Sequence, residues 1–294
     1  MIIDGHAHAF GDYLTAQSIA ETLDAAGAHQ VVLSPGESAG NGGYWLPDLA
    51  SRWPGWDPMR AVNRIVRVAV ALSGKSSDIP AGNEEVFRLR QAIPGLVRQC
   101  YWLDPRPTGA MEDLARHFDQ WRFCMVKLHQ CWTPFTPSDQ VIESVAAWCG
   151  ETGLPLFVHI YRRNDVLSFL NLCRRHRRTQ FILGHLIGAA SAEENLRKLD
   201  NVYIDTSPPQ LVASARILEA VRRVGSGRLL LGSDTPYGRQ NLRRAIERVD
   251  SLPLTSVDKE MILGGNLAAM LSAVDPRAGG TSYGSDEQAR TRRT

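Results

Sequence analysis

Eight short runs of apolar, β-type residues alternate with amphipathic stretches, and this alternation limits the fold more than any other feature of the chain. The runs predict strands at residues 1–8, 30–35, 98–104, 124–130, 155–160, 180–185, 201–206 and 228–234. The other stretches predict helices, among them 15–27, 110–121, 138–153, 164–176, 191–199, 212–225, 239–252 and 256–274. Strands that alternate with helices form parallel βα units. Eight such units predict an α/β fold, the (β/α)8 TIM barrel, which typically has about 250 residues. An open doubly wound sheet is disfavoured because no GxGxxG follows the first strand.

A long segment, residues 36–97, separates the second and third expected strands. We expect it to be an inserted loop and helical segment on the C-terminal face of the barrel, where active sites are built. Its second part, residues 59–74 and 82–93, predicts two helices. Its first part is rich in Gly, Pro and Trp, and its aromatic residues are expected to form a lid or a substrate wall, with Trp45 as a substrate-binding residue: Tyr44, Trp45, Trp53 and Trp56. The alternative is a surface loop that packs its own aromatic side chains.

Residues 1–275 are expected to form the barrel domain, and residues 276–294 a disordered tail, because the tail has almost no apolar side chains. The chain has 33 Lys and Arg against 31 Asp and Glu, a net charge of +2. The tail holds four Arg against two acidic residues, so the expected barrel carries equal numbers of basic and acidic side chains. This balance disfavours nucleic acid as a partner.

The sequence also predicts where the protein works. No run of apolar residues is long enough for a membrane span, and the N-terminus, MIIDGHAHAF, does not resemble a secretory signal. The five cysteines form no CxxC pair, which is typical of free thiols in a reducing compartment. We therefore expect a cytoplasmic protein without a membrane partner.

Polar side chains stand at the C-terminal ends of most expected strands. Five of the eight histidines of the chain belong to this set. In a closed barrel these positions converge on one pocket. In strand order, the residues are His6, His8, Lys127, His129, His159, His185, Asp205 and Asp234.

Part of this set predicts a metal site. His6 and His8 are two residues apart on a strand, so their side chains lie on one face, about 7 Å apart along the backbone, and both can reach one divalent ion. His159 and Asp234 each follow a buried apolar run, where a polar group needs a partner. Each residue alone has a simpler explanation, such as a backbone-bonded core histidine or a helix cap. Three histidines and one carboxylate together predict a catalytic metal with open positions.

These strand-end residues stand in motifs that resemble those of the amidohydrolase superfamily, and most closely its amidohydrolase-2 branch, over residues 1–274. That branch contains hydrolases of amides, lactones and related bonds, and also decarboxylases. The resemblance rests on an ordered set of motifs: Asp4-Gly5-His6-Ala7-His8, Val126-Lys127-Leu128-His129, Val158-His159, Leu183-Gly184-His185, Gly232-Ser233-Asp234-Thr235-Pro236-Tyr237 and Gly265-Asn266-Leu267-Ala268-Ala269-Met270.

The resemblance implies that one divalent metal is bound, with zinc preferred and manganese as the alternative. The implied ligands are His6, His8, His159 and Asp234. His185 is implied to be a catalytic histidine that polarises the scissile carbonyl or protonates the leaving group. Asp234 is also implied to accept a proton from a water that the metal activates. The alternatives for His185 are that it supports the ligands from behind or that it is itself a second metal ligand.

Lys127 is open to two interpretations. Some members of the superfamily carry a carbamylated lysine at the end of the fourth strand, where it bridges two metals. The favoured interpretation is a single metal, with Lys127 binding an anionic group of the substrate. His129 lies on the same face as Lys127 and is expected to be a substrate-binding residue. Asp205 is expected to hold Lys127 or His185, or to cap the next turn.

These observations predict a metal-dependent hydrolase that uses metal-activated water on an amide, lactone or ester of a small organic molecule. The alternative is a non-oxidative decarboxylase of an aromatic or unsaturated acid. It is weakened by the short chain and by the apolar residues 186–190, where such decarboxylases often have a glycine-rich stretch. A metal-dependent nuclease is disfavoured by the near-neutral charge, and a non-enzymatic binding protein by the intact ligand set. Homo-oligomerisation is left open.

Overall fold

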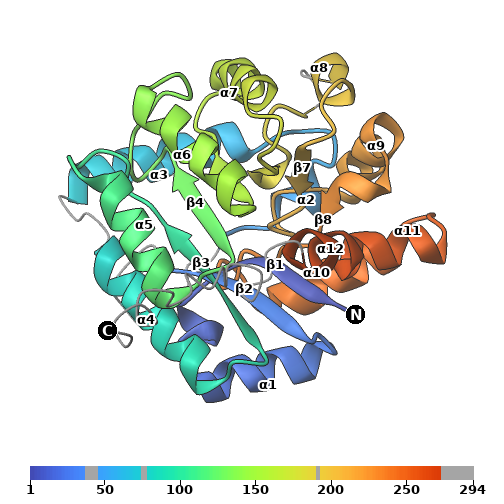
Figure 1. Cartoon of the computed structure of the whole chain (residues 1–294). Helices are drawn as coiled ribbons and strands as arrows, with labels where there is room; N and C mark the ends of the chain where they lie inside the picture. The colour runs from blue at the N-terminus through green and yellow to red at the C-terminus, as the bar shows by residue number, and fades with distance from the viewer. Residues whose placement is uncertain (37–45, 74–77, 190–192, 273–294) are drawn as a thin grey trace, which may run out of the picture.

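The computed structural model describes residues 1–36, 46–73, 78–189 and 193–272. Eight parallel strands form one sheet in the order of the sequence, and the helices lie outside them (Figure 1). The protein is thus a TIM barrel, as the sequence predicts. The strands are β1 (Ile3–His8), β2 (Gln30–Ser34), β3 (Val97–Trp102), β4 (Met125–His129), β5 (Leu156–His159), β6 (Phe181–Leu183), β7 (Val202–Asp205) and β8 (Leu229–Leu230).

Most expected helices are present with similar bounds. The α-helices of the described residues are α1 (Ala16–Ala26), α2 (Leu49–Arg52), α3 (Met59–Ser73), α4 (Ile79–Ala92), α5 (Ala110–Trp121), α6 (Gln140–Thr152), α7 (Arg163–Arg175), α8 (Glu193–Arg197), α9 (Ser214–Val224), α10 (Asn241–Asp250), α11 (Ser256–Glu260) and α12 (Asn266–Ser272). Helices α2, α3 and α4 belong to the insertion between β2 and β3, which confirms the two helices predicted there. None of the helices in the described part of the chain is long and apolar enough to cross a membrane.

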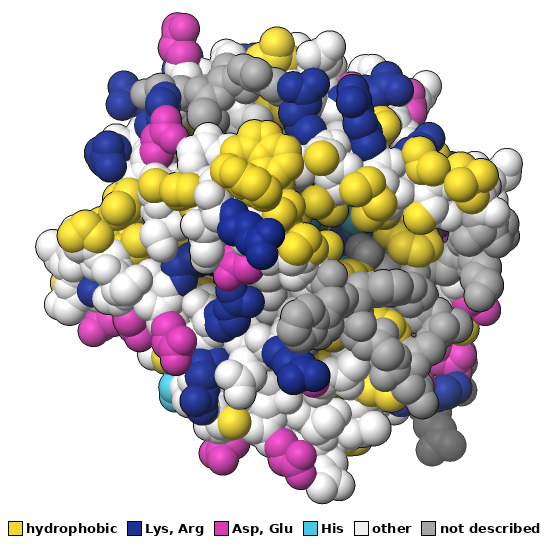
Figure 2. Space-filling model, turned by 180° about the vertical axis from the view of Figure 1, so that it is seen from behind, with side chains coloured by type: hydrophobic (Ala, Val, Ile, Leu, Met, Phe, Trp, Pro, Cys, Tyr) yellow, Lys and Arg dark blue, Asp and Glu magenta, His cyan; other side chains and the backbone are white. Residues whose placement is uncertain are grey.

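Two stretches with sequence predictions lie outside the described residues. One contains Tyr44 and Trp45, and the other contains the C-terminal tail, residues 276–294. The other two aromatic residues in the first part of the insertion, Trp53 and Trp56, are largely exposed and pack edge to face, with ring centroids 6.0 Å apart. On the face shown in Figure 2, hydrophobic side chains gather in patches, with Lys and Arg beside them. Exposed apolar side chains of the described residues include Ile65, Val68 and Leu72 on α3.

The inside of the barrel is filled in layers because side chains alternate along each strand. An apolar layer at one end is formed by the following residues, with Leu267 and Met270 of α12 packed against them: Ile3, Val32, Cys100, Met125, Phe157, Ile182 and Leu230. Two residues further along three of these strands stand Trp102, Lys127 and His159. The next layer, toward the C-terminal ends, is therefore polar and aromatic. A larger apolar core lies between the strands and the helices.

The barrel closes between β1 and the segment that follows β8. The Gly5 N–H donates to the Leu231 carbonyl at 2.9 Å, and the Asp234 N–H donates to the His6 carbonyl at 2.8 Å. Buried Asp4 strengthens this seam, since its carboxylate accepts hydrogen bonds from the Ser233 N–H at 2.9 Å and the Ser233 hydroxyl at 2.6 Å. Closure therefore brings the end of β1 against Asp234.

All five cysteines lie in the described residues, and none forms a disulfide. Burial raises the pKa of the Cys100 thiol to about 11, and burial also raises the pKa of Cys173 well above its usual value. Both thiols are thus protonated near neutral pH and unreactive.

The closing seam should not accept a side chain at Gly5. A Cβ at this position would lie 2.7 Å from the Leu231 carbonyl oxygen and 2.9 Å from Leu267 Cδ2. We expect Gly5→Ala to lower the free energy of unfolding by about 1–3 kcal/mol, measured by denaturant titration. Gly95→Ala is the matched control, because a Cβ there meets nothing within 4 Å. Equal stability of the two variants would contradict the tight closure.

Candidate active site

All eight predicted polar residues are buried at the C-terminal end of the barrel. Two of them lie beyond the strands that were expected to carry them. β6 ends at Leu183 and β8 at Leu230, and the chain turns sharply at His185 (φ 60°) and Asp234 (φ 53°). Positive φ is uncommon for residues with a Cβ and concentrates at functional sites. The turns point these two side chains toward the residues on the other strands.

His6, His8 and Asp234 form one cluster of possible metal ligands, whose nitrogen and oxygen atoms lie within 4.8 Å of one another. Asp234 Oδ1 is 3.7 Å from His6 Nε2 and 3.5 Å from His8 Nε2. Lys127 Nζ contacts the same two nitrogens, at 2.9 Å and 3.0 Å. Three of the four predicted ligands therefore meet, with Lys127 directly beside them.

Hydrogen bonds behind the two β1 histidines leave Nε2 of each free of a hydrogen. His8 Nδ1 donates to the Pro35 carbonyl at 2.7 Å. His6 Nδ1 lies 3.0 Å from Ser207 Oγ, and the Ser207 hydroxyl donates its own hydrogen to Asp205 Oδ2 at 2.6 Å. His6 Nδ1 is therefore the donor to Ser207. A neutral imidazole carries one hydrogen, so both Nε2 atoms keep a lone pair that faces the cluster.

His159, the fourth predicted ligand, does not belong to this cluster. Its Nδ1 lies 3.0 Å from Nε2 of His185, and its Nε2 lies 2.9 Å from Oδ1 of Asn63. Its ring stacks on His129 with centroids 3.8 Å apart and an interplanar angle of 14°. His129 in turn stacks on Trp102 at 5.4 Å. His159 and His185 thus form a second pair of nitrogens beside the first cluster.

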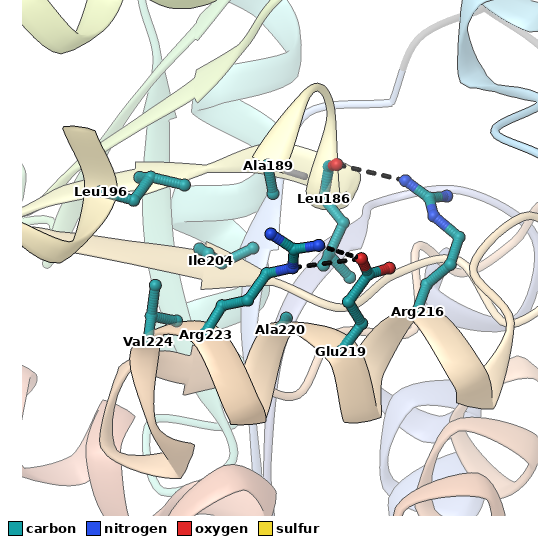
Figure 3. Close-up of a pocket in the computed structure, with 9 residues that line it drawn as sticks. All are labelled: Leu186, Ala189, Leu196, Ile204, Arg216, Glu219, Ala220, Arg223 and Val224. Carbon is teal, nitrogen blue, oxygen red and sulfur yellow. Dashed lines mark hydrogen bonds and ion pairs between the residues drawn. The ribbon is translucent and has the colours of Figure 1, made fainter. Parts of the chain in front are cut away.

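His185 is held from the side of β7. Its Nδ1 lies 3.0 Å from the Ser207 carbonyl, which can only accept, and its N–H donates to Asp205 Oδ2 at 3.1 Å. Asp205 therefore orients His185, one of the roles that the sequence predicts for it. The next residue, Leu186, is held by Arg216 of α9, whose Nη2 donates to the Leu186 carbonyl at 3.2 Å (Figure 3). The cavity beside them is too small for a substrate, since about 20 Å³ holds a single water.

A further group, His129, Cys131 and His159, also has ligand atoms within 4.8 Å of one another. Its geometry disfavours a metal. The lone pairs of an imidazole lie in the plane of its ring, and the rings of His129 and His159 are nearly parallel. Their lone pairs therefore do not converge on one point, and Cys131 remains a buried thiol.

The protonation states of the cluster suit a cation. Burial, together with the charge of Lys127, lowers the pKa of His6 well below its usual value. Burial and neighbouring His129 do the same for His159. Burial by itself would raise the pKa of Asp234, but the electrostatic influence of the neighbouring histidines, His6 first, outweighs it and leaves the pKa lowered. Neutral imidazoles and an ionised carboxylate are the forms that bind a divalent metal, so the donor set fits one.

Two residues that support the site were not predicted from the sequence. Asn63 comes from α3 of the insertion, and Ser207 follows β7. Asn63 had a weak signal, a polar residue within an amphipathic helix. However, α3 also carries the apolar stripe of Ile65, Val68 and Leu72, which proves to be exposed. The amphipathic pattern of α3 alone therefore did not show that the face with Asn63 points toward the barrel.

Comparison with known proteins identifies the family. The model of the amidohydrolase family matches residues 3–272, nearly the whole chain, so this protein belongs to that family. It is an enzyme of the amidohydrolase superfamily. None of the curated proteins matches the sequence significantly.

Solved structures with the same fold share little sequence with this chain. 2,6-Dihydroxybenzoate decarboxylase from Rhizobium is 15% identical, with a TM-score of 0.65, covering 92% of this chain and 98% of its own. 4-Oxalomesaconate hydratase from Rhodopseudomonas palustris is 14% identical, with a TM-score of 0.63 and coverages of 95% and 98%. A probable 2-pyrone-4,6-dicarboxylic acid hydrolase from Acinetobacter baumannii is 14% identical, with a TM-score of 0.64 and coverages of 92% and 99%.

Proposed function

We propose that the protein is a metal-dependent hydrolase that uses metal-activated water on an amide, lactone or ester bond of a small organic molecule. The observation that carries this proposal is the cluster of His6, His8 and Asp234 at the barrel mouth. The Asp234 carboxylate lies beside the Nε2 atoms of His6 and His8, and His185 Nδ1 is 4.0 Å from its other oxygen. A proton acceptor and a proton donor thus flank the same small space.

We assign one divalent ion, zinc by preference and manganese as the alternative, to His6, His8 and Asp234. His159, which lies outside this cluster, is the fourth ligand that the family resemblance implies. A second metal, bridged by carbamylated Lys127, is the less favoured arrangement. The protonated form of Lys127 would repel a cation bound at the same two nitrogens. Lys127 is therefore suited to turn toward an anionic group of the substrate, next to His129.

When bound, the metal polarises a carbonyl group and lowers the pKa of a water molecule. Asp234 would accept the proton released by the attacking water. His185 donates a proton from Nε2 to the leaving group, while the Ser207 carbonyl holds its Nδ1 and Asp205 holds its backbone N–H. The stacked rings of Trp102, His129 and His159 line one side of the site and limit the access of bulk water.

A non-oxidative decarboxylase is the second candidate. It is favoured by the structural likeness to 2,6-dihydroxybenzoate decarboxylase and to 5-carboxyvanillate decarboxylase from Sphingomonas paucimobilis. Lys127, which lies over the Trp102 ring beside the stacked rings of His129 and His159, offers a cation for the carboxylate of an aromatic acid. In that reaction the metal would orient the substrate, and no water would be consumed.

The fate of solvent oxygen distinguishes the two reactions. We expect the metal-loaded enzyme, screened on small amides, lactones and aromatic acids in H₂¹⁸O, to incorporate one ¹⁸O atom into the product carboxylate, as detected by mass spectrometry. The Asp234→Asn variant serves as the control for background hydrolysis. Release of carbon dioxide without ¹⁸O in the remaining product would establish the decarboxylase instead.

The ligand assignment predicts the metal content of variants. We expect the His6→Ala/His8→Ala double variant to lose the bound metal while it stays folded, as measured by elemental analysis and circular dichroism. The His29→Ala/His117→Ala double variant is the matched control, because both histidines lie outside the site, and it should keep the metal. Full metal content in the His6→Ala/His8→Ala protein would show that the ligands lie elsewhere.

A Lys127 variant distinguishes a site with one metal ion from a site with two. In the favoured arrangement Lys127 does not hold the metal, so Lys127→Ala should keep one tightly bound ion and bind an anionic substrate more weakly, with a higher KM. Metal titration of the wild type and the variant under bicarbonate measures the stoichiometry. A fall from two ions to one would support the carbamylated bridge instead.

A further inference from the structure

We infer that Asn63, on the inserted helix α3, is a positioning residue that fixes the tautomer of His159 and so offers Nδ1, not Nε2, to the metal. This inference rests on the proposed function, because His159 is a ligand only in that proposal. It assigns a part in the site to the insertion, whose described residues contain α2, α3 and α4.

The contacts of Asn63 determine the orientation of its amide group. Asn63 is 1% exposed, and its Nδ2 donates to the Ile160 carbonyl at 3.0 Å and to the Tyr161 carbonyl at 3.1 Å. Both partners can only accept, so the amide nitrogen must face them. The amide oxygen then faces His159 Nε2 at 2.9 Å. An amide oxygen has no hydrogen to give, so Nε2 must carry the hydrogen of this bond.

The tautomer follows from this bond. A neutral imidazole with its hydrogen on Nε2 has its lone pair on Nδ1. Nδ1 of His159 is the atom that lies toward the site, 3.0 Å from His185 Nε2, so in the metal-free protein its lone pair accepts the Nε2 hydrogen that the proposed mechanism assigns to His185. Stacking on His129 fixes the plane of the ring, but it does not determine which nitrogen carries the hydrogen. The hydrogen bond to Asn63 determines that Nε2 carries it.

Helix α3 is well anchored for this task. Arg67, one turn after Asn63, donates from Nη1 to the Gln130 carbonyl at 2.8 Å, so α3 is tied to the loops that follow both β4 and β5. Before the helix, Asp57 pairs with Arg216 of α9 at 3.2 Å. Asn63 is thus held between two fixed points, which limits how far its amide oxygen can move from His159.

Asn83 on α4 provides a matched control. It is also 1% exposed, and it also joins the insertion to the barrel, because its Nδ2 donates to the Trp102 carbonyl at 2.8 Å and its Oδ1 accepts from the Trp102 N–H at 2.9 Å. The hydrogen bonds of the Asn83 side chain go to backbone groups, whereas the Asn63 side chain also bonds an imidazole. Loss of Asn83 should therefore cost stability alone.

The test compares Asn63→Leu, Asn63→Asp and Asn83→Leu with the wild type. We expect Asn63→Leu to bind Zn²⁺ about 10–100-fold more weakly in competition with a chelator. Asn63→Asp keeps an acceptor for Nε2 and should retain most of the affinity. Asn83→Leu should lower the Tm and leave the affinity unchanged. Equal zinc affinity of Asn63→Leu and the wild type would overturn the inference.

A second measurement does not depend on metal binding. ¹⁵N-histidine NMR of the metal-free wild type should show His159 with a hydrogen on Nε2 and none on Nδ1, with its signals assigned by their loss in His159→Gln. Asn63→Leu should show a mixture of tautomers. A hydrogen on Nδ1 in the wild type would refute the role of Asn63 even if Asn63→Leu failed to fold. A wild type that bound no metal but had the expected tautomer would refute the proposed function alone.

Discussion

The closure of the barrel between β1 and the chain after β8 is the constraint on which the site depends. The backbone bonds that close the barrel also place Asp234 against His6 and His8, because the Asp234 N–H donates to the His6 carbonyl. The carboxylate of Asp4 joins the same two segments through Ser233. Side chains that are more than two hundred residues apart in the sequence thus meet as a direct result of the fold.

In each histidine of the site, one ring nitrogen bonds a supporting group and the other faces the site. In His6, His8 and His185, Nδ1 is bonded to a group on a neighbouring loop, and Nε2 faces the interior. In His159 the arrangement is reversed, with Nε2 bonded to Asn63. Each ring is therefore oriented by a second partner, which reduces the rearrangement that a bound cation would require.

The sequence predicted the strands and most of the residues that gather at their ends, because both follow from local periodicity. The two-residue repeat along β4 and β5 places Lys127 and His159 on the inner face in any barrel of this kind. The sequence did not predict the early ends of β6 and β8, because apolar residues continue past them. The sharp turns at His185 and Asp234 follow from packing between distant segments.

The contacts that support the site from Ser207 and from the insertion also could not be predicted from the sequence. Ser207 serves two histidines at once, and Asn63 reaches the site only because α3 lies over the loops after β4 and β5. Such contacts depend on tertiary structure, and a residue pattern within one helix does not encode them. The separation of His159 from the other three candidate ligands likewise became visible only in three dimensions.

The anchoring of α3 affects how readily the enzyme could change its substrate. In a barrel, the loops on the C-terminal face can usually be exchanged without disturbing the strands. Here, the helix that borders the entrance also bonds to an imidazole inside. Replacing the whole insertion would therefore alter the inner chemistry together with the outer surface. Substitutions at exposed positions of the same helix, such as Ile65 and Val68, would leave that bond untouched.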